Sequence, residues 1–154
     1  MKRFFVCIAP VFVAIVSSPS SLSAAGQESA IQIEKAWARA SIIASRPAAA
    51  YLTIVNQGSK PDRLISVSSP VAKTVSIHLS ETTNGISQMS PVHELPIHPR
   101  AKVTFNPSGL HLMLMNLRGP LKKGEVLPLT LNFQTAGRIN IDALILDPGA
   151  KEPE

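Results

Sequence analysis

Short apolar segments separated by Pro, Gly and Asn make up most of the chain from Ile31 onward, and this pattern constrains the fold more than any other feature. Many segments alternate apolar and polar side chains, which is typical of half-buried β-strands, and no stretch shows sustained helical periodicity. We therefore predict a single all-β domain, an antiparallel β-sandwich or barrel. The expected strands are residues 31–39, 48–56, 62–67, 74–79, 86–89, 102–105, 110–117, 127–133 and 138–146.

The expected strand at residues 110–117 has two faces of different chemistry. Three leucines alternate with His111, Met113 and Met115, so that the leucines share one face and the imidazole and thioethers share the other. The leucine face is expected to belong to the core. The opposite face is unusual, because neutral imidazole and thioether are soft ligands that suit monovalent copper. Packing of methionine in a sandwich core is the alternative interpretation of this face.

A second segment adds the same two side-chain types. His78 lies near the end of the expected strand at residues 74–79, and Met89 ends the strand at residues 86–89. Asn84-Gly85 lies between the two strands and predicts a hairpin with a tight turn. That hairpin would bring His78 close to Met89. Two imidazoles and two thioethers without a thiolate or carboxylate favour Cu(I) over zinc, calcium or magnesium.

The N-terminus has the pattern of an export signal. Lys2 and Arg3 precede an apolar run at residues 4–16, and Ser23-Ala24-Ala25 fits the small-residue cleavage rule. We predict a cleaved secretory signal peptide at residues 1–25, a β-sandwich domain at residues 26–146 and a polar tail, expected to fray, at residues 147–154. An uncleaved membrane anchor is the alternative, although the apolar run is short for a membrane span. We expect a periplasmic protein without stable membrane insertion.

Cleavage would remove the only cysteine, Cys7, which lies too near the start to resemble a lipoprotein cysteine. The mature chain would then lack both disulfides and thiolate ligands. A blue-copper electron-transfer site needs a cysteine and is nearly excluded. Lys and Arg are scattered along the sequence, and few aromatic residues are available to stack on bases, so no nucleic-acid partner is expected. No Gly-x-Ser-x-Gly motif supports a hydrolase, and we predict that the protein is not an enzyme.

The spacing of the four soft side chains resembles a known motif. His78, Met89, His111 and Met113 follow the pattern H-x10-M-x21-H-x-M of the PCu(A)C family of periplasmic copper chaperones. Flanking segments that also resemble the family are Trp37-Ala38-Arg39-Ala40, residues 49–56, Asp62-Arg63-Leu64, residues 109–115 and residues 120–124. The resemblance spans nearly the whole expected mature chain.

This resemblance implies a cupredoxin-like Greek-key β-sandwich that binds one Cu(I) per chain through those four residues. It also implies delivery of copper towards the dinuclear copper site of cytochrome c oxidase, often alongside a thiol-bearing partner. Met115 is outside the motif and is either an accessory thioether or a packing residue. The chain departs from some members at Leu79, where they carry another methionine, and in its tail, which lacks a His/Met-rich extension.

Two interpretations stay open for the function. The first is a Cu(I) chaperone that works as a monomer and passes copper to a recipient protein. The second is a metal-free exported binding or assembly module whose His and Met side chains serve packing. His93 and His98 are expected to be surface residues, because side chains five apart on a strand face opposite sides.

Overall fold

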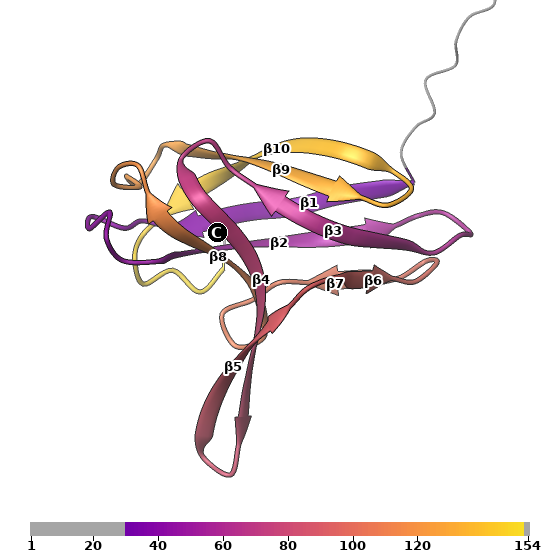
Figure 1. The fold of residues 1–154 in the computed structure, drawn as a ribbon, viewed down its shortest axis with the longest axis horizontal. Helices are drawn as coiled ribbons and strands as arrows, with labels where there is room; N and C mark the ends of the chain where they lie inside the picture. Colours follow the sequence, from indigo (N-terminus) through magenta and orange to yellow (C-terminus); the bar gives the residue numbers. More distant parts are fainter. Residues whose placement is uncertain (1–29, 153–154) are drawn as a thin grey trace, which may run out of the picture.

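The computed structural model describes residues 30–152, and within this range the chain forms ten β-strands and no helix (Figure 1). The predicted all-β fold is confirmed. The predicted signal peptide lies outside the described residues, and the described part contains no helical segment that could serve as a membrane span. The strands are β1 (Ile31–Arg39), β2 (Ala48–Asn56), β3 (Asp62–Ser68), β4 (Ala72–Thr83), β5 (Ile86–Val92), β6 (Leu95–Ile97), β7 (Lys102–Thr104), β8 (Leu110–Leu117), β9 (Val126–Phe133) and β10 (Gly137–Leu146).

Hydrogen bonding joins the strands into one mixed sheet that curls into a sandwich. The order along the sheet is β5-β4-β8-β2-β1-β10-β9-β3-β6, and β7 pairs with β2. Neighbouring strands are antiparallel except β1 and β10, which run parallel. The topology places β4, β8 and β2 side by side, although long stretches of sequence separate them. Residues from these distant segments can therefore meet on one face.

The core lies between the two layers and is built mainly from leucine and isoleucine. Leu112 and Leu114 of β8 are fully buried, as are Leu52 and Ile54 of β2 and Leu129 and Leu131 of β9. Burial of each such side chain contributes about 1.5–3 kcal/mol. The predicted leucine face of β8 is thus the core face. The side chains that alternate with these leucines in β8, His111, Met113 and Met115, lie on the opposite face of the strand.

The β4–β5 hairpin extends beyond the body of the sandwich (Figure 1). Its tip is the predicted Asn84-Gly85 turn, and Thr83 pairs with Ile86 directly across it. Asn84 and Gly85 both have positive φ, 53° and 77°, which is what the tight primed turn of a two-residue hairpin requires. The turn fixes the hairpin register, and this register decides which residue of β5 lies beside His78.

Apart from the parallel β1–β10 pair, two features of the fold were not expected from the sequence. The three-residue strand β6 contains Pro96 and was not predicted, because so short a segment has no detectable alternation. The tail is attached to the domain up to Ala150, which packs against the core and accepts a 2.8 Å hydrogen bond from Arg39 Nε at its carbonyl. An ion pair of 2.7 Å between Lys123 and Asp147 also connects the tail to the β8–β9 loop.

Candidate metal centre

The pairing of β4 with β8 brings the two predicted histidines together. His78 and His111 are direct cross-strand partners, and their ring centroids are 5.9 Å apart. Side chains that are directly opposite in an antiparallel pair project from the same face of the sheet. Two imidazoles at this separation can share one metal ion, because a metal–nitrogen bond is about 2.0 Å long.

The same register places the two thioethers on this face. Met113 pairs with Ser76, two residues before His78, and Met89 pairs with Ser80, two residues after His78. Since side chains two apart on a strand share a face, all four predicted ligands project from one face of the β5–β4–β8 segment. The structure therefore assembles the predicted set of four residues.

A shallow hollow of about 180 Å³ marks this site on the surface. Met89, His111 and Met113 line it, and His78 lies beside it as the partner of His111. Met115, two residues after Met113 on β8, pairs with Thr74 and does not line the hollow. The other lining residues are Pro47, Ala48, Ala49, Tyr51, Ser80 and Pro107.

The four side chains differ widely in their exposure to solvent. His111 is only 5% exposed, and His78 and Met113 are partly buried. Met89, on the projecting hairpin, is 51% exposed. The site thus has a buried side formed by β8 and an open side formed by β5.

Hydrogen bonds fix the orientation of both imidazoles. His111 Nδ1 lies 3.0 Å from the carbonyl oxygen of Gly109, to which it donates, so the lone pair of His111 Nε2 is available to a ligand. A backbone carbonyl that receives the second ring N–H is a common arrangement behind metal-binding histidines. His78 Nε2 lies 3.0 Å from the hydroxyl of Ser76.

His78 Nδ1 is a buried polar atom that has no hydrogen-bond partner among the residues the structure describes. Such a group is costly to bury, and a metal ion is one way to compensate the cost. Burial and, to a smaller extent, the neighbouring His111 lower the pKa of His78 below its ordinary value. A lower pKa favours the neutral imidazole, which is the form that binds metals.

The donor set suits a soft metal ion. Two neutral imidazoles and two thioethers carry no charge, and Cu(I) prefers such ligands to the oxygen ligands of calcium and magnesium. No group of three or more His, Cys, Asp or Glu side chains within residues 30–152 could hold a harder ion. The residues present therefore fit Cu(I), and the methionines are needed to complete the site.

The remaining predicted residues fall outside this cluster. His93 and His98 are exposed and flank β6, as expected for surface histidines. Leu79 pairs with Leu110, so it projects from the opposite face of β4 to His78. A methionine at position 79 of this backbone would point away from the site.

Sequence reasoning did not identify two side chains that shape the site. Tyr51 lines the hollow and stacks on Trp37 with ring centroids 4.4 Å apart, and Ser76 orients His78. Tyr51 lies in a segment that resembles the family, but nothing in the sequence places it beside His111. Ser76 could have been found, because a hydroxyl two residues before a strand histidine shares its face.

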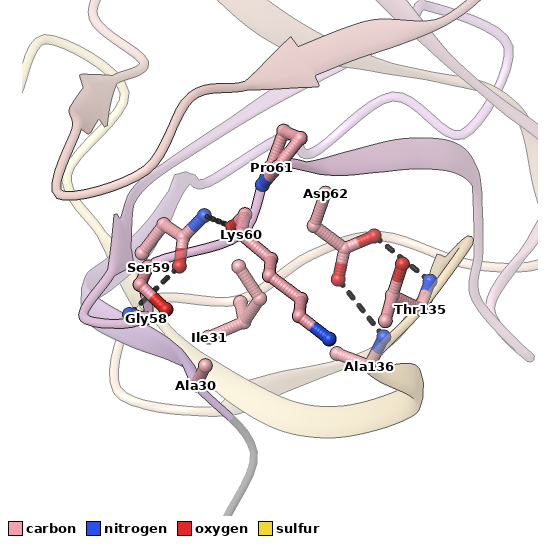
Figure 2. Close-up of a pocket in the computed structure, with 10 residues that line it drawn as sticks. Ala30, Ile31, Gly58, Ser59, Lys60, Pro61, Asp62, Thr135 and Ala136 are labelled. Carbon is pink, nitrogen blue, oxygen red and sulfur yellow. Dashed lines mark hydrogen bonds between the residues drawn. The ribbon is translucent and has the colours of Figure 1, made fainter.

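A second, larger cavity of about 360 Å³ lies elsewhere, where the β2–β3 loop meets the β9–β10 turn (Figure 2). Two of its polar side chains, Asp62 and Asn56, are used by the fold itself. Asp62 accepts hydrogen bonds from the backbone N–H groups of Thr135 and Ala136 at 2.8 and 2.9 Å, and the Asn56 amide donates to the carbonyl of Lys60 at 2.8 Å. These bonds join two loops, and this cavity offers no soft donors.

Comparison with known proteins identifies a family, sequence relatives and solved structures of the same fold. The family model described as "Putative lipoprotein LpqE-like" matches residues 31–145. A protein of Leifsonia xyli subsp. xyli, described as a putative lipoprotein, is 29% identical over 140 residues, which are 89% of this chain and 83% of that protein.

Among solved structures, the apo PCuAC domain of PmoF2 is 30% identical, with a TM-score of 0.68 over 80% of this chain and 94% of that domain. The same domain has been solved with copper bound. The solution structure of Cu(I)-DR1885 from Deinococcus radiodurans is 28% identical, with a TM-score of 0.58 over 82% of this chain and 85% of that protein. The family match covers most of the described residues, and the chain therefore belongs to the LpqE-like family, with a domain of the PCuAC type.

Proposed function

We propose that this protein is a Cu(I) carrier that binds one copper ion per chain through His78, Met89, His111 and Met113 and delivers it to a recipient protein. The observation that carries the proposal is the β5–β4–β8 register, which places these four soft donors on one face. Copper is the cargo of this protein. The role is transport, and no reaction is catalysed.

Three properties of the site support binding followed by release. The donors are soft but include no thiolate, so copper is held without being trapped. His78 Nδ1 is buried without a partner, and bound copper would satisfy a histidine already held in place. The hollow is open on the side of Met89, so a partner can reach the ion. The copper-bound relatives support the identity of the metal.

Export to the periplasm completes the proposal, and it accounts for the choice of ligands. Thioethers remain competent in an oxidising compartment, where free thiols form disulfides. The recipient we propose is the dinuclear copper site of cytochrome c oxidase, reached directly or through a thiol-bearing assembly protein. The carrier works as a monomer, and each chain holds its own copper ion.

Copper titration of residues 26–154 under reducing conditions, against a competing Cu(I) chelator, tests the proposal. We expect one Cu(I) per chain, and X-ray absorption at the copper edge should show both nitrogen and sulfur neighbours. Absence of binding above the chelator background would refute the proposal. The methionines would then be packing residues of a metal-free binding module.

A further inference from the structure

One end of the sandwich carries most of the positive charge of the described protein. The basic end consists of residues 39–47, 69–73, 118–125 and 147–152, which contain seven Lys and Arg and three Asp and Glu. The rest of the described chain contains six basic and five acidic residues. Four of the five net positive charges therefore lie at the basic end, although the same residues are scattered in the sequence.

Backbone hydrogen bonds hold these segments side by side. Ser41 and Leu121 exchange two bonds of 2.9 Å, which join the β1–β2 loop to the β8–β9 loop. Arg118 N donates to the carbonyl of Val71 at 2.9 Å, and Ala40 N donates to that of Leu146 at 2.9 Å. The connecting loops lie on the left of Figure 1. The basic end is thus a continuous surface of fixed shape.

Four of the positive charges at this end are free to meet a partner, whereas Lys123 pairs with Asp147. Arg46, Lys73, Arg118 and Lys122 are exposed, and none of them takes part in an ion pair within residues 30–152. Elsewhere in the described protein, Arg63 pairs with Glu94 and Lys102 pairs with Glu34. Lys35, Lys60, Arg100 and Arg138, elsewhere in the described protein, are likewise exposed and outside any ion pair within residues 30–152, so the asymmetry is one of net charge.

Two large apolar side chains project from the same end. Ile42 is 84% exposed and Ile43 is 42% exposed, on a loop fixed at Ser41 and closed by a 3.0 Å hydrogen bond from Arg46 N to the carbonyl of Ile43. An exposed apolar pair on an ordered loop, with cations around it, is the composition of an interaction site with an apolar centre and a charged rim.

The basic end borders the metal centre. Arg46 precedes Pro47, which lines the hollow together with His111 and Met113, so the basic end meets the hollow at Arg46; Arg118 lies five residues beyond Met113, after the end of β8. A molecule seated on the basic end would therefore lie next to the copper ligands.

We propose that the basic end is the docking surface for the copper recipient, and that the recipient is a protein with an apolar patch rimmed by carboxylates. This inference rests on the proposed function, because exchange of copper requires the acceptor's donor atoms to approach Met89 and Met113. An anionic membrane would match the charge and the isoleucines, but it has no soft donors to receive copper. Complementary charge would also raise the rate of encounter.

The test is stopped-flow transfer of Cu(I) from the loaded protein to two synthetic peptides. Both contain two cysteines separated by three residues, flanked by glutamates in one peptide and by lysines in the other. We expect transfer to the acidic peptide to be about tenfold faster at low salt, and the advantage should decline towards 0.5 M salt as charges are screened. Equal rates for the two peptides would overturn the proposal.

Two charge-reversed proteins locate the surface. Arg46→Glu with Arg118→Glu should remove the preference for the acidic peptide, whereas the matched control, Lys60→Glu with Arg138→Glu, should keep it. Ile42→Ser with Ile43→Ser should slow transfer to the acidic peptide about threefold or more, since the apolar centre is lost. Loss of the preference for the acidic peptide in the control, Lys60→Glu with Arg138→Glu, would show that net charge alone matters. That result would refute a docking surface.

Copper affinity and vesicle binding separate the other outcomes. Each variant should retain wild-type Cu(I) affinity against the chelator. If the wild-type protein binds no copper, the proposed function fails, whereas normal affinity with unselective transfer contradicts the docking surface alone. Metal-free protein that sediments with vesicles containing phosphatidylglycerol, and loses this property in the Arg46→Glu/Arg118→Glu variant, would assign the basic end to a membrane instead.

Discussion

Replacement of Met113 by leucine tests the metal centre with little disturbance of the fold. Met113 lies between Ala49 and Ser76 on the neighbouring strands, faces the hollow and is only partly buried. Leucine and methionine have similar volumes, so we expect a loss of less than about 1.5 kcal/mol in the free energy of unfolding. The change removes one of the four proposed donors to the metal.

The expected loss of Cu(I) affinity is much larger than the loss of stability. Removal of a group that merely orients a ligand typically lowers metal affinity 10- to 100-fold, so loss of a direct ligand should lower it at least about 100-fold, or about 2.8 kcal/mol. Competition with a Cu(I) chelator measures the affinity. Urea unfolding, followed by fluorescence of the single tryptophan, Trp37, measures the stability, because this side chain is only 4% exposed.

Met115→Leu is the matched control, on the same face of β8 but outside the hollow. It should change copper affinity less than about threefold, since no metal donor is lost. A folded Met113→Leu protein with wild-type affinity would refute the assignment of Met113. An equal loss in both variants would make Met115 a ligand as well.

Three further substitutions probe other parts of the argument. His111→Ala should abolish Cu(I) binding above the chelator background while circular dichroism still reports a β-sheet protein; retained binding would remove His111 from the ligand set. Met89→Leu should increase the rate of Cu(I) release to a chelator by at least about tenfold, because the donor on the open side is lost; an unchanged rate would argue for a three-ligand site. Asp62→Ala should lower the free energy of unfolding by about 2 kcal/mol, and the urea midpoint by about 1 M, because Thr135 N and Ala136 N lose their acceptor. An unchanged midpoint would show that water replaces the carboxylate at no cost.

Most of the fold could be predicted because strand patterns are local. The bounds of β1, β2 and β8 are those expected, since alternation and turn residues mark each of these segments in the sequence. The Asn84-Gly85 turn sets the hairpin register, and this register places Met89 opposite Ser80, on the same face of the sheet as His78. The parallel pairing of β1 with β10 joins the two ends of the domain, and no local pattern encodes such a contact.

The surroundings of the site could not be predicted, because they depend on which strands are neighbours. Tyr51 lines the same hollow as His111 only because β2 pairs with β8, and the basic residues gather only because three loops and the tail meet at one end. Lys and Arg are scattered along the sequence, but the fold brings seven of the thirteen described ones to one end. Alternation along a strand predicts which side chains share a face. A patch formed by several loops can be predicted only when the strand topology is known.

The unequal exposure of the four proposed ligands indicates how such a site would both hold and release copper. His111 is buried and is fixed by a hydrogen bond to the Gly109 carbonyl. Its side chain therefore would lose little conformational entropy when copper binds. Met89 belongs to a hairpin that extends away from the core, and it is half exposed. A thioether is a neutral, replaceable donor, and this one is the most accessible to an incoming thiolate. Exchange that begins at Met89 would keep the ion bound to the histidines until the acceptor supplies a new ligand, so copper would pass between proteins without entering the solvent.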